Sequence, residues 1–352
     1  MHRQGRLQTN IMKLTIYRTD NTNPYENLAT EEMLTFSCEE DEVIFYLWQN
    51  AHTVVIGRNQ NPWRECNVEN IKADDVYLAR RISGGGAVYH DMGNLNFTFA
   101  ARDGLYDIGR QTDVILLACR LMGINAVKNG RNDLTVDDKK FSGHAYFSSD
   151  TYNYHHGTIM MNVSSDALPK YLQVSESKLK SKGVSSVKSR VTNLMNEIPA
   201  DRLEEICGPA DQVSEAERTA RAVRAMQDAL ITAAEKEYGC KAEFRELPET
   251  PAELKQKYSS EEWRYGTRIP FTKDIEHRFE WGGVEVQLDM KGEYINNCKI
   301  YSDSLETELF SQVEELLPGC KYDRAEILGL KLPKGTSATG YELLELIASS
   351  IE

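Results

Sequence analysis

The chain has 352 residues, of which 41% are hydrophobic, and it carries a formal net charge of −13. This length fits one large domain with a smaller one, or two of similar size, with ample apolar material for a core. So negative a charge argues against nucleic acid as a main partner, because broad binding of a phosphate backbone needs a basic face. Any anionic ligand must therefore be held by local arginines, lysines and backbone N–H groups.

The cysteines and the lengths of the apolar runs favour a reduced, cytoplasmic setting. The seven cysteines are odd in number and show no Cys-x-x-Cys spacing, which argues against a zinc ribbon or a disulfide framework. No apolar run approaches the ~20 residues of a membrane span, so we expect no membrane partner. The polar residues 1–11 lack the apolar segment of a secretory signal and are expected to be a disordered extension.

Apolar spacing predicts strands alternating with helices over the first two thirds of the chain. Strands are expected at 14–17, 43–48, 53–56, 87–89, 96–100, 134–136, 140–147 and 158–163. Helices are expected at 27–37, 112–122 and 218–238, the last ending at Gly239. This alternation predicts an α/β domain built on a mixed sheet.

A smaller α+β unit is expected after a linker. Residues 247–270 are polar and bracketed by prolines, and they predict a connecting helix. Beyond them lie expected strands at 276–281, 284–288 and 298–301, with a turn at Gly282-Gly283, and helices at 305–317 and 340–350. We therefore place a large domain at 12–246, the linker at 247–270 and a small domain at 271–352.

A loop of three consecutive glycines, Gly84 to Gly86, follows two arginines and precedes a short strand. Glycines let a backbone approach a ligand closely, and successive N–H groups in such a loop form an anion site. Arg81 would add a forked donor. A glycine-rich turn without a ligand fits the glycines equally well. The spacing matches neither a Walker loop nor a Rossmann fingerprint.

Two further motifs place charged groups in turns and strands. Arg131, Asn132 and Asp133 offer a forked donor, an amide that can read a base edge and a carboxylate that can hold Mg²⁺. Lys140 precedes Gly143 and could project its ammonium into a pocket as a point charge. The alternatives are that Asn-Asp simply forms the turn and that the lysine is solvated.

The paired histidines His155 and His156 invite a metal assignment, but adjacent residues of a strand point to opposite faces. We therefore expect structural or ligand-lining roles for them. A basic segment at 177–194, with five lysines and arginines and no acidic residue, could clamp phosphates or be a solvated loop.

In order and spacing, these motifs resemble those of the lipoate–protein ligase A family. The segments that carry the resemblance are 80–91, 130–134, 140–143, 155–158 and 183–191, joined by 27–32 and 54–62. The resemblance is strong over residues 13–195 and moderate up to residue 246. Over the small C-terminal domain it is a resemblance of architecture. It implies an α/β (α+β) fold, with a biotin/lipoyl-ligase-like mixed-sheet catalytic domain at 12–246 and a small accessory domain.

The resemblance implies an enzyme that converts lipoate and Mg·ATP to lipoyl-AMP and pyrophosphate. The lipoyl group would then pass to a lysine of a lipoyl-domain acceptor, in 2-oxoacid dehydrogenases or the glycine-cleavage H protein. ATP and Mg²⁺ are the implied co-substrate and metal. A cytoplasmic monomer is expected.

The resemblance also implies roles for residues at the matching positions. Lys140 should contact the lipoate carbonyl and the phosphate, Asn132 and Asp133 should lie on the adenine and metal side, and Asp133 is the candidate Mg²⁺ ligand. Residues 178–190 match a loop that orders over the adenylate. The nucleotide and adenylate phosphate should be bound by Arg81 and by the backbone of Gly86, Ala87, Val88 and Tyr89. Lipoate should be bound by Gly84, Gly85, His90, His156 and Lys140.

Two rival functions stay open. One is a cysteine-dependent octanoyl or lipoyl transferase of the same superfamily, which needs an activated cysteine in its pocket. None of the seven cysteines lies within the five motifs. The other is a non-catalytic lipoate- or nucleotide-binding protein, which the intact Arg81 and Lys140 disfavour. The base that deprotonates the acceptor lysine, whose reference pKa is about 10.4, has no candidate.

Overall fold

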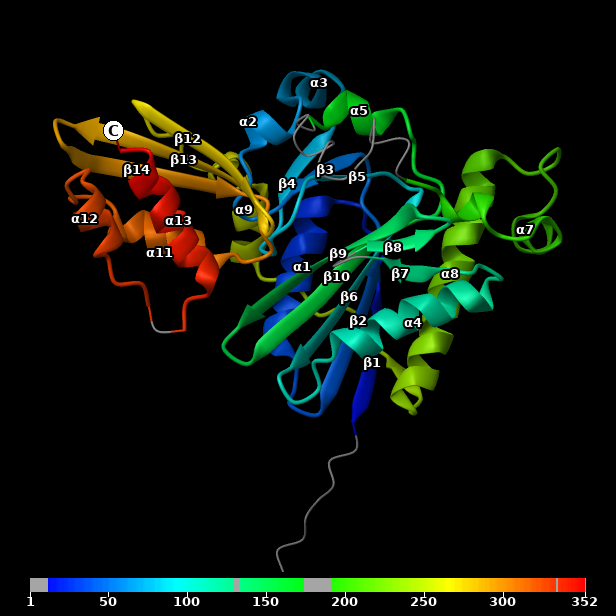
Figure 1. Ribbon diagram of the computed structural model, residues 1–352. Coiled ribbons are helices and arrows are strands. Elements are labelled where there is room, and N and C mark those ends of the chain that lie inside the picture. The colour runs from blue at the N-terminus through cyan, green and yellow to red at the C-terminus, as the bar shows by residue number, and fades with distance from the viewer. Residues whose placement is uncertain (1–11, 130–132, 174–190, 334, 352) are drawn as a thin grey trace, which may run out of the picture. The chain divides into compact units, whose positions relative to one another are not determined.

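The computed structural model describes residues 12–129, 133–173, 191–333 and 335–351. It separates into two compact units, each assembled from three segments of the chain. The first unit comprises Met1–Ala51, His90–Ser164 and Val184–Lys255, and the second comprises His52–Tyr89, Ser165–Gly183 and Gln256–Glu352. Figure 1 labels most of their helices and strands. Each unit is described by itself below.

The first unit is built on an eight-stranded sheet with the order β11-β1-β2-β6-β10-β9-β8-β7 within the described residues. Strand β1 pairs in parallel with β2 and β11, whereas the β2–β6, β6–β10, β10–β9, β9–β8 and β8–β7 pairs are antiparallel. The sheet is therefore mixed, as predicted. The strands are β1 (Lys13–Arg18), β2 (Glu42–Trp48), β6 (Asn94–Arg102), β7 (Val127–Asn129), β8 (Asp133–Val136), β9 (Lys139–Ser149), β10 (Tyr152–Met160) and β11 (Ala242–Phe244).

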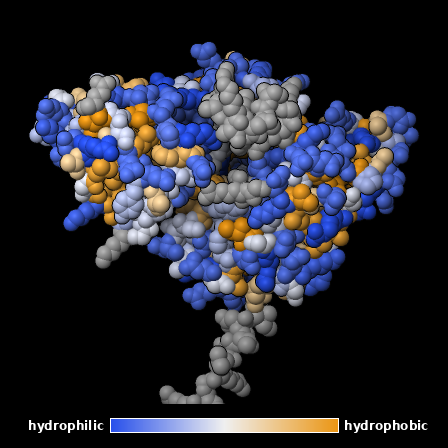
Figure 2. Space-filling model, viewed as in Figure 1, coloured by the Kyte–Doolittle hydropathy of each residue, from blue (hydrophilic) through white to orange (hydrophobic). Residues whose placement is uncertain are grey.

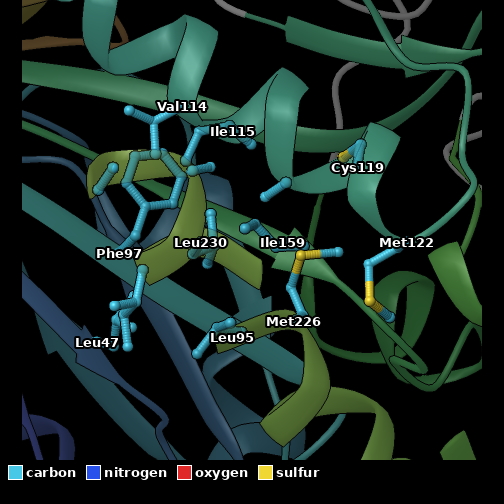
Figure 3. Packing of buried hydrophobic residues seen from close by; sticks show 14 of the residues in the cluster. Leu47, Leu95, Phe97, Val114, Ile115, Cys119, Met122, Ile159, Met226 and Leu230 are labelled. Atoms are coloured by element: carbon cyan, nitrogen blue, oxygen red, sulfur yellow. The ribbon is translucent and has the colours of Figure 1, made fainter. Parts of the chain in front are cut away.

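One face of this sheet is apolar and is covered by helices α4 (Ile108–Leu121) and α8 (Glu215–Tyr238). Alternate residues of the strands, such as Leu47, Phe97 and Ile159, are fully buried against the two helices (Figure 3). The period of two along each strand puts these apolar side chains on one face, where burial stabilises the sheet. Helix α8 ends at Gly239, which has a φ of 68°.

The opposite face of the sheet contacts helix α1 (Pro24–Ser37) and is more polar. Asn23 caps the start of α1 by accepting the N–H of Tyr25, and Pro24 occupies the first turn, where it costs no hydrogen bond. Helix α7 (Ala200–Cys207) and a 3-10 turn at Leu194–Asn196 complete the first unit.

The second unit contains two three-stranded sheets within the described residues. One has the order β4-β3-β5, and β5 ends at His90, the first residue of the next segment of the other unit. The other has the antiparallel order β12-β13-β14 and packs against α11 and α13. The strands are β3 (Thr53–Ile56), β4 (Tyr77–Arg80), β5 (Val88–His90), β12 (Lys273–Phe279), β13 (Gly282–Lys291) and β14 (Tyr294–Ser302). The helices are α2 (Pro62–Glu65), α3 (Val68–Ala73), α5 (Ala167–Tyr171), α9 (Ala252–Ser259), α10 (Glu261–Tyr265), α11 (Glu308–Leu316), α12 (Arg324–Leu328) and α13 (Ala338–Ser349), and α9 begins in the first unit.

Two predicted elements differ from the structure. The strand expected at 158–163 is β10, which ends at Met160, because the N–H groups of Met161 and Asn162 both turn to the carbonyl oxygen of Gly93. The turn expected at Gly282-Gly283 lies two residues earlier, because Gly282 already pairs with Phe279 across the hairpin. Gly282 packs closely on Asp303 and Ser304 instead, where a Cβ would lie 3.0 to 3.1 Å from their atoms.

The visible surface is mostly hydrophilic, with hydrophobic residues in small groups (Figure 2). Among the described residues, no helix is both long and apolar enough to cross a bilayer.

Candidate functional site

A β-bulge in the first unit sets the direction of Lys140. Strands β8 and β9 pair Asp133 with Gly143 and Leu134 with Ser142, but the next pair joins Thr135 to Lys140. Phe141 is therefore an extra residue on β9, and its side chain is fully buried in the apolar core. A bulge of this kind re-aims the side chains beside it.

The bulge brings Lys140 onto the same face of the sheet as Gly143. In a regular strand, residues three apart point to opposite faces, and the one extra residue reverses this. The Nζ of Lys140 lies 2.7 Å from Oδ1 of Asp133. It also lies over Gly143, where a Cβ would be 2.5 Å from Nζ. Glycine at this position therefore leaves the space that the ammonium occupies.

The same face carries a row of polar side chains across the neighbouring strands. Trp48 and Thr158 both pair with Asn96, and the Thr158 Oγ1 accepts the N–H of Gly143 at 3.4 Å. Asn94 donates to the side-chain oxygen of Asn96 at 2.9 Å. The remaining amide groups, Asn94 Oδ1 and Asn96 Nδ2, are buried and have no hydrogen-bond partner among the described residues. A ligand could therefore meet both a donor and an acceptor here.

Glu31 of α1 places a buried carboxylate over this face. Its Oε1 accepts hydrogen bonds from Thr98 Oγ1 at 2.5 Å and from His156 Nδ1 at 2.8 Å. The Trp48 indole donates in turn to Thr98 at 3.1 Å. His156, predicted to line the lipoate site, thus lies on the face of Lys140 and is held by a carboxylate.

His155 points to the opposite face, so the prediction that the two histidines diverge is confirmed. Its Nδ1 lies 3.1 Å from Gln111 Oε1 on α4, and its Nε2 lies 3.0 Å from His144 Nδ1. His144 Nε2 lies 3.0 Å from the hydroxyl of Ser142. Burial lowers the pKa of His144 to about 3 and that of His155 well below its ordinary range. Among the described residues, no cluster of three His, Cys, Asp or Glu side chains could hold a metal.

The three-glycine loop lies in the second unit, where close backbone packing accounts for Gly84 and a positive φ accounts for Gly85. A Cβ on Gly84 would lie 2.2 Å from the carbonyl oxygen of Ser304, and one on Gly57 would lie 2.3 Å from that of Gly85. Gly85 has a φ of 89° and donates its N–H to the same Ser304 oxygen at 2.9 Å. Both the turn and the contact with residue 304 therefore require glycine.

The two arginines before the loop, Arg80 and Arg81, are buried and donate hydrogen bonds to backbone carbonyl oxygens. Arg81 donates to the carbonyls of Gly84 and Gly86 at 2.6 and 2.9 Å. Arg80 donates to Gly57, Arg58 and Gln60 after β3, and to Trp263 and Arg264 of α10. Burial lowers the pKa of Arg80 to about 10. The sequence prediction singled out Arg81 and overlooked Arg80, which holds more carbonyls.

The predicted site residues fall in both units. Arg81 and Gly84 to Tyr89 belong to the second, where the Tyr89 hydroxyl lies 2.9 Å from His52 Nδ1. Asp133, Lys140, His156 and His90 belong to the first, where His90 Nδ1 lies 3.2 Å from the Asn50 amide. Asn132 and most of the basic segment, 177–190, lie outside the described residues.

Sequence reasoning missed the polar row that accompanies Lys140. Asn94, Asn96 and Thr98 recur at every second position of β6, and the prediction treated 96–100 simply as a strand. The period of two already separates these polar residues from Leu95 and Phe97. A polar stripe within a strand buried on both faces is the pattern that could have identified them.

Comparison with known proteins gives consistent matches. Residues 23–208 match the lipoyl protein ligase A/B catalytic domain, and residues 269–330 match the bacterial lipoate protein ligase C-terminus. The chain is 40% identical over 328 residues to the lipoate-protein ligase A of Psychrobacter cryohalolentis, covering 90% of this chain and 91% of the relative.

Solved structures agree with these matches. P. falciparum LipL1 in complex with lipoate has a TM-score of 0.76 and 26% identity, over 96% of this chain and 99% of its own. A lipoate-protein ligase A bound with ATP has a TM-score of 0.56 and 23% identity, over 73% of this chain and 99% of its own, which shows a shared fold.

Proposed function

The chain belongs to the lipoate–protein ligase A family, and on that premise we propose that it attaches lipoate to acceptor proteins in two steps. Lipoate and ATP first give lipoyl-AMP and pyrophosphate. A lysine ε-amine of the acceptor then attacks the acyl carbonyl and releases AMP. The predicted family and fold are confirmed, and the solved relatives that hold lipoate or ATP support these two substrates.

The placement of Lys140 is the observation that carries this proposal. The bulge at Phe141 directs its ammonium over Gly143 and beside Asp133. In the first step two anions meet, the lipoate carboxylate and the α-phosphate, and a fixed ammonium offsets their repulsion. In the second step the same ammonium would stabilise the oxyanion on the acyl carbonyl. The adenylate is a mixed anhydride, so no enzyme nucleophile is required.

We assign the nucleotide and the adenylate phosphate to the three-glycine loop. Backbone N–H groups of Gly86 to Tyr89 would bind the phosphate. Arg81 supports this role by holding the carbonyl oxygens of Gly84 and Gly86, because a carbonyl turned toward a phosphate would repel it. Direct contact between Arg81 and the phosphate stays a prediction.

Asp133, with Asn132, would hold Mg²⁺ together with phosphate oxygens. Mg²⁺ commonly uses one or two protein carboxylates and completes its shell with phosphate and water, so a single carboxylate fits. When bound, the metal would neutralise phosphate charge as it develops. Asp133 also orients Lys140 through the 2.7 Å ion pair.

For lipoate we keep Gly84, Gly85, His90 and His156 as candidate contacts and add Asn96. The buried amide of Asn96 shares a face of the sheet with Lys140 and lacks a hydrogen-bond partner among the described residues for its Nδ2. It is thus suited to a polar atom at the carboxylate end of the substrate.

The seven thiols count against the cysteine-dependent transferase. An activated cysteine needs a lowered pKa. Burial instead raises the pKa of Cys38, Cys66 and Cys119 to about 12 and also raises the pKa of the other four. Thiolate chemistry is therefore disfavoured at every cysteine of the chain. The non-catalytic alternative gives no role to the half-buried ion pair between Lys140 and Asp133.

The acceptors would be lipoyl-domain proteins and the H protein, which present the lysine. A cytoplasmic monomer without a membrane partner remains our expectation. The net charge of −13 argues against a nucleic-acid partner.

ATP–pyrophosphate exchange tests this function, with lipoate, octanoate and biotin offered separately. Exchange that depends on lipoate or octanoate, and its loss in Lys140→Ala, would support the proposal. Acyl transfer without ATP, or an acyl-thioester trapped on a cysteine, would favour the transferase instead.

A further inference from the structure

On the side of the sheet away from Lys140, four buried side chains form a continuous hydrogen-bonded chain. It runs from Ser142 through His144 and His155 to Gln111 of α4. We propose that His144 is a positioning residue, which holds the bulge of β9 and thereby aims the Lys140 ammonium at the reacting carboxylate. The inference rests on the proposed function for that last role.

The protonation states of the two histidines fix which atom donates in each hydrogen bond of this series. Both imidazoles are neutral, since burial lowers their pKa values. Gln111 presents Oε1, an acceptor, so His155 donates from Nδ1 and accepts at Nε2. His144 must then donate from Nδ1 and accept at Nε2, where the Ser142 hydroxyl donates. Each ring nitrogen in the chain is thereby matched to a partner of the opposite kind.

The hydrogen-bonded chain of side chains holds β9 immediately after the bulge. Ser142 and His144 flank Gly143, over which the Lys140 ammonium lies. The extra residue Phe141 has no partner on β8, so the ladder alone does not fix the strand there. The carbonyl of Lys140 accepts the N–H of Thr192 at 2.9 Å. The bond between Ser142 and His144, anchored to His155 on β10, adds a second constraint directly after the bulge.

A direct catalytic role for these groups does not fit their burial. Ser142, Gln111 and His155 are fully buried, and His144 is 5% exposed. Their side chains lie on the core side of the sheet. The ring centroid of Phe97 there lies 5.4 Å from the ring centroids of both His144 and His155. They can therefore affect the reaction only through the backbone that carries Lys140.

The test compares three variants of the full-length chain with a matched control. Ser142→Ala removes the first donor, and His144→Leu removes the centre of the chain. His144→Asn restores a donor toward His155, because its amide nitrogen takes the place of Nδ1. Val114→Ala is the control, since it opens the same buried core on α4 without touching the hydrogen-bonded chain.

Two measurements separate positioning from simple stability. Reductive methylation of Lys140 is measured relative to its exposed neighbour Lys139, which serves as an internal reference. The kcat and KM for lipoyl-AMP formation are measured alongside, at a temperature well below each variant's midpoint. A displaced ammonium should lower kcat more than it raises KM, because the loss concerns the transition state.

We expect the Lys140:Lys139 labelling ratio to rise and kcat to fall by about tenfold or more in Ser142→Ala and His144→Leu. His144→Asn should recover much of both, and Val114→Ala should change neither. An unchanged labelling ratio in His144→Leu, or an equal change in Val114→Ala, overturns the inference. If the wild type makes no lipoyl-AMP, the proposed function fails, while the labelling ratio still decides whether His144 positions Lys140.

Discussion

At the scale of single residues, Gly143 tests whether the space above β9 serves Lys140. In Gly143→Ala the added Cβ would lie 2.5 Å from Nζ and 2.8 Å from Cε of Lys140. These atoms form the far end of a flexible side chain, so the fold should tolerate the change within about 1 kcal/mol. We expect kcat for lipoyl-AMP formation to fall by about tenfold or more, because the ammonium is displaced.

Gly104→Ala is the matched control for that substitution, because a Cβ there meets nothing within 4 Å. Steady-state kinetics and thermal unfolding of both variants should show a kinetic loss confined to position 143. Equal activity in the two variants would mean that the position of the ammonium does not limit adenylation.

Arg81→Lys tests the support of the three-glycine loop. The buried guanidinium binds the carbonyl oxygens of Gly84 and Gly86 with a fork that an ammonium cannot reproduce. Losing hydrogen bonds from a buried charged donor costs about 1.5–3 kcal/mol each. We expect a lower melting temperature and a raised KM for ATP, measured by calorimetry and pyrophosphate exchange. An unchanged KM for ATP would show that Arg81 does not contribute to nucleotide binding.

At the scale of elements, the link from β9 through β10 to α4 should make stability depend on pH. His144 has a pKa of about 3 when folded and an ordinary value of 6.5, and that of His155 is also lowered. Between pH 6.5 and 3 the unfolded chain therefore binds protons that the folded chain does not. The free energy of unfolding should fall on acidification by up to about 1.4 kcal/mol per pH unit for each histidine.

Urea unfolding at pH 7, 6 and 5 measures this slope. The double variant His144→Asn/His155→Gln separates the contribution of the histidines from that of the carboxylates, which also titrate as the pH falls. The double variant should be less stable at pH 7 and should lose less stability between pH 6 and 5. Parallel pH profiles for the two proteins would show that the histidines are not held neutral in the folded state.

Much of the element order could be predicted from the sequence, because apolar periodicity reports burial directly. The strand expected at 53–56 coincides with β3, and the helix expected at 218–238 lies within α8 and ends at Gly239. The turn that joins the strands expected at 134–136 and 140–147 falls at Asp137 and Asp138, and both residues have positive φ, as such hairpin turns require. Short elements such as β4, α2 and α12 were missed, since five residues or fewer carry too little periodicity. Strand β3 is equally short, but its four residues are all β-branched and buried, which is a strand signal in itself.

The candidate site was predicted less completely than the fold. Motif spacing located Lys140, Asp133 and His156, which share one face of the sheet. The bulge was not predictable, because it depends on the register between two strands. The hydrogen-bonded chain through His144 was missed for the same reason, since its members become neighbours only through strand pairing and helix packing.

At the scale of the whole molecule, the compact units are not continuous in sequence. Residues 52–89, which carry the three-glycine loop, cluster with the C-terminal segment in the second unit. Ser302 donates to the Asn59 carbonyl at 2.8 Å, and Asn59 donates to the Thr307 carbonyl at 2.8 Å. Arg64 pairs with Asp274, Glu276 and Glu285. A linear division at 246 and 270 thus remains a prediction that cuts across these contacts.

Removing residues 256–352 distinguishes the two divisions. If the second unit is the physical one, residues 52–89 lose the partners of Gly85, Asn59, Arg64 and Arg80, while the eight-stranded sheet keeps its own core. We expect the 1–255 fragment to retain slow amide hydrogen exchange in β2, β6 and β10. Exchange in residues 52–89 should accelerate by about a hundredfold or more, because local opening then costs less free energy.

Co-expression of 1–255 and 256–352 as separate chains is the control, since it keeps the cut but restores the contacts. That pair should recover both the slow exchange in residues 52–89 and lipoate-dependent pyrophosphate exchange. If instead the 1–255 fragment alone protects β3 and β4 as well as the full chain does, the large domain is self-sufficient. The C-terminal segment would then be an accessory to the three-glycine loop and not part of the unit that folds it.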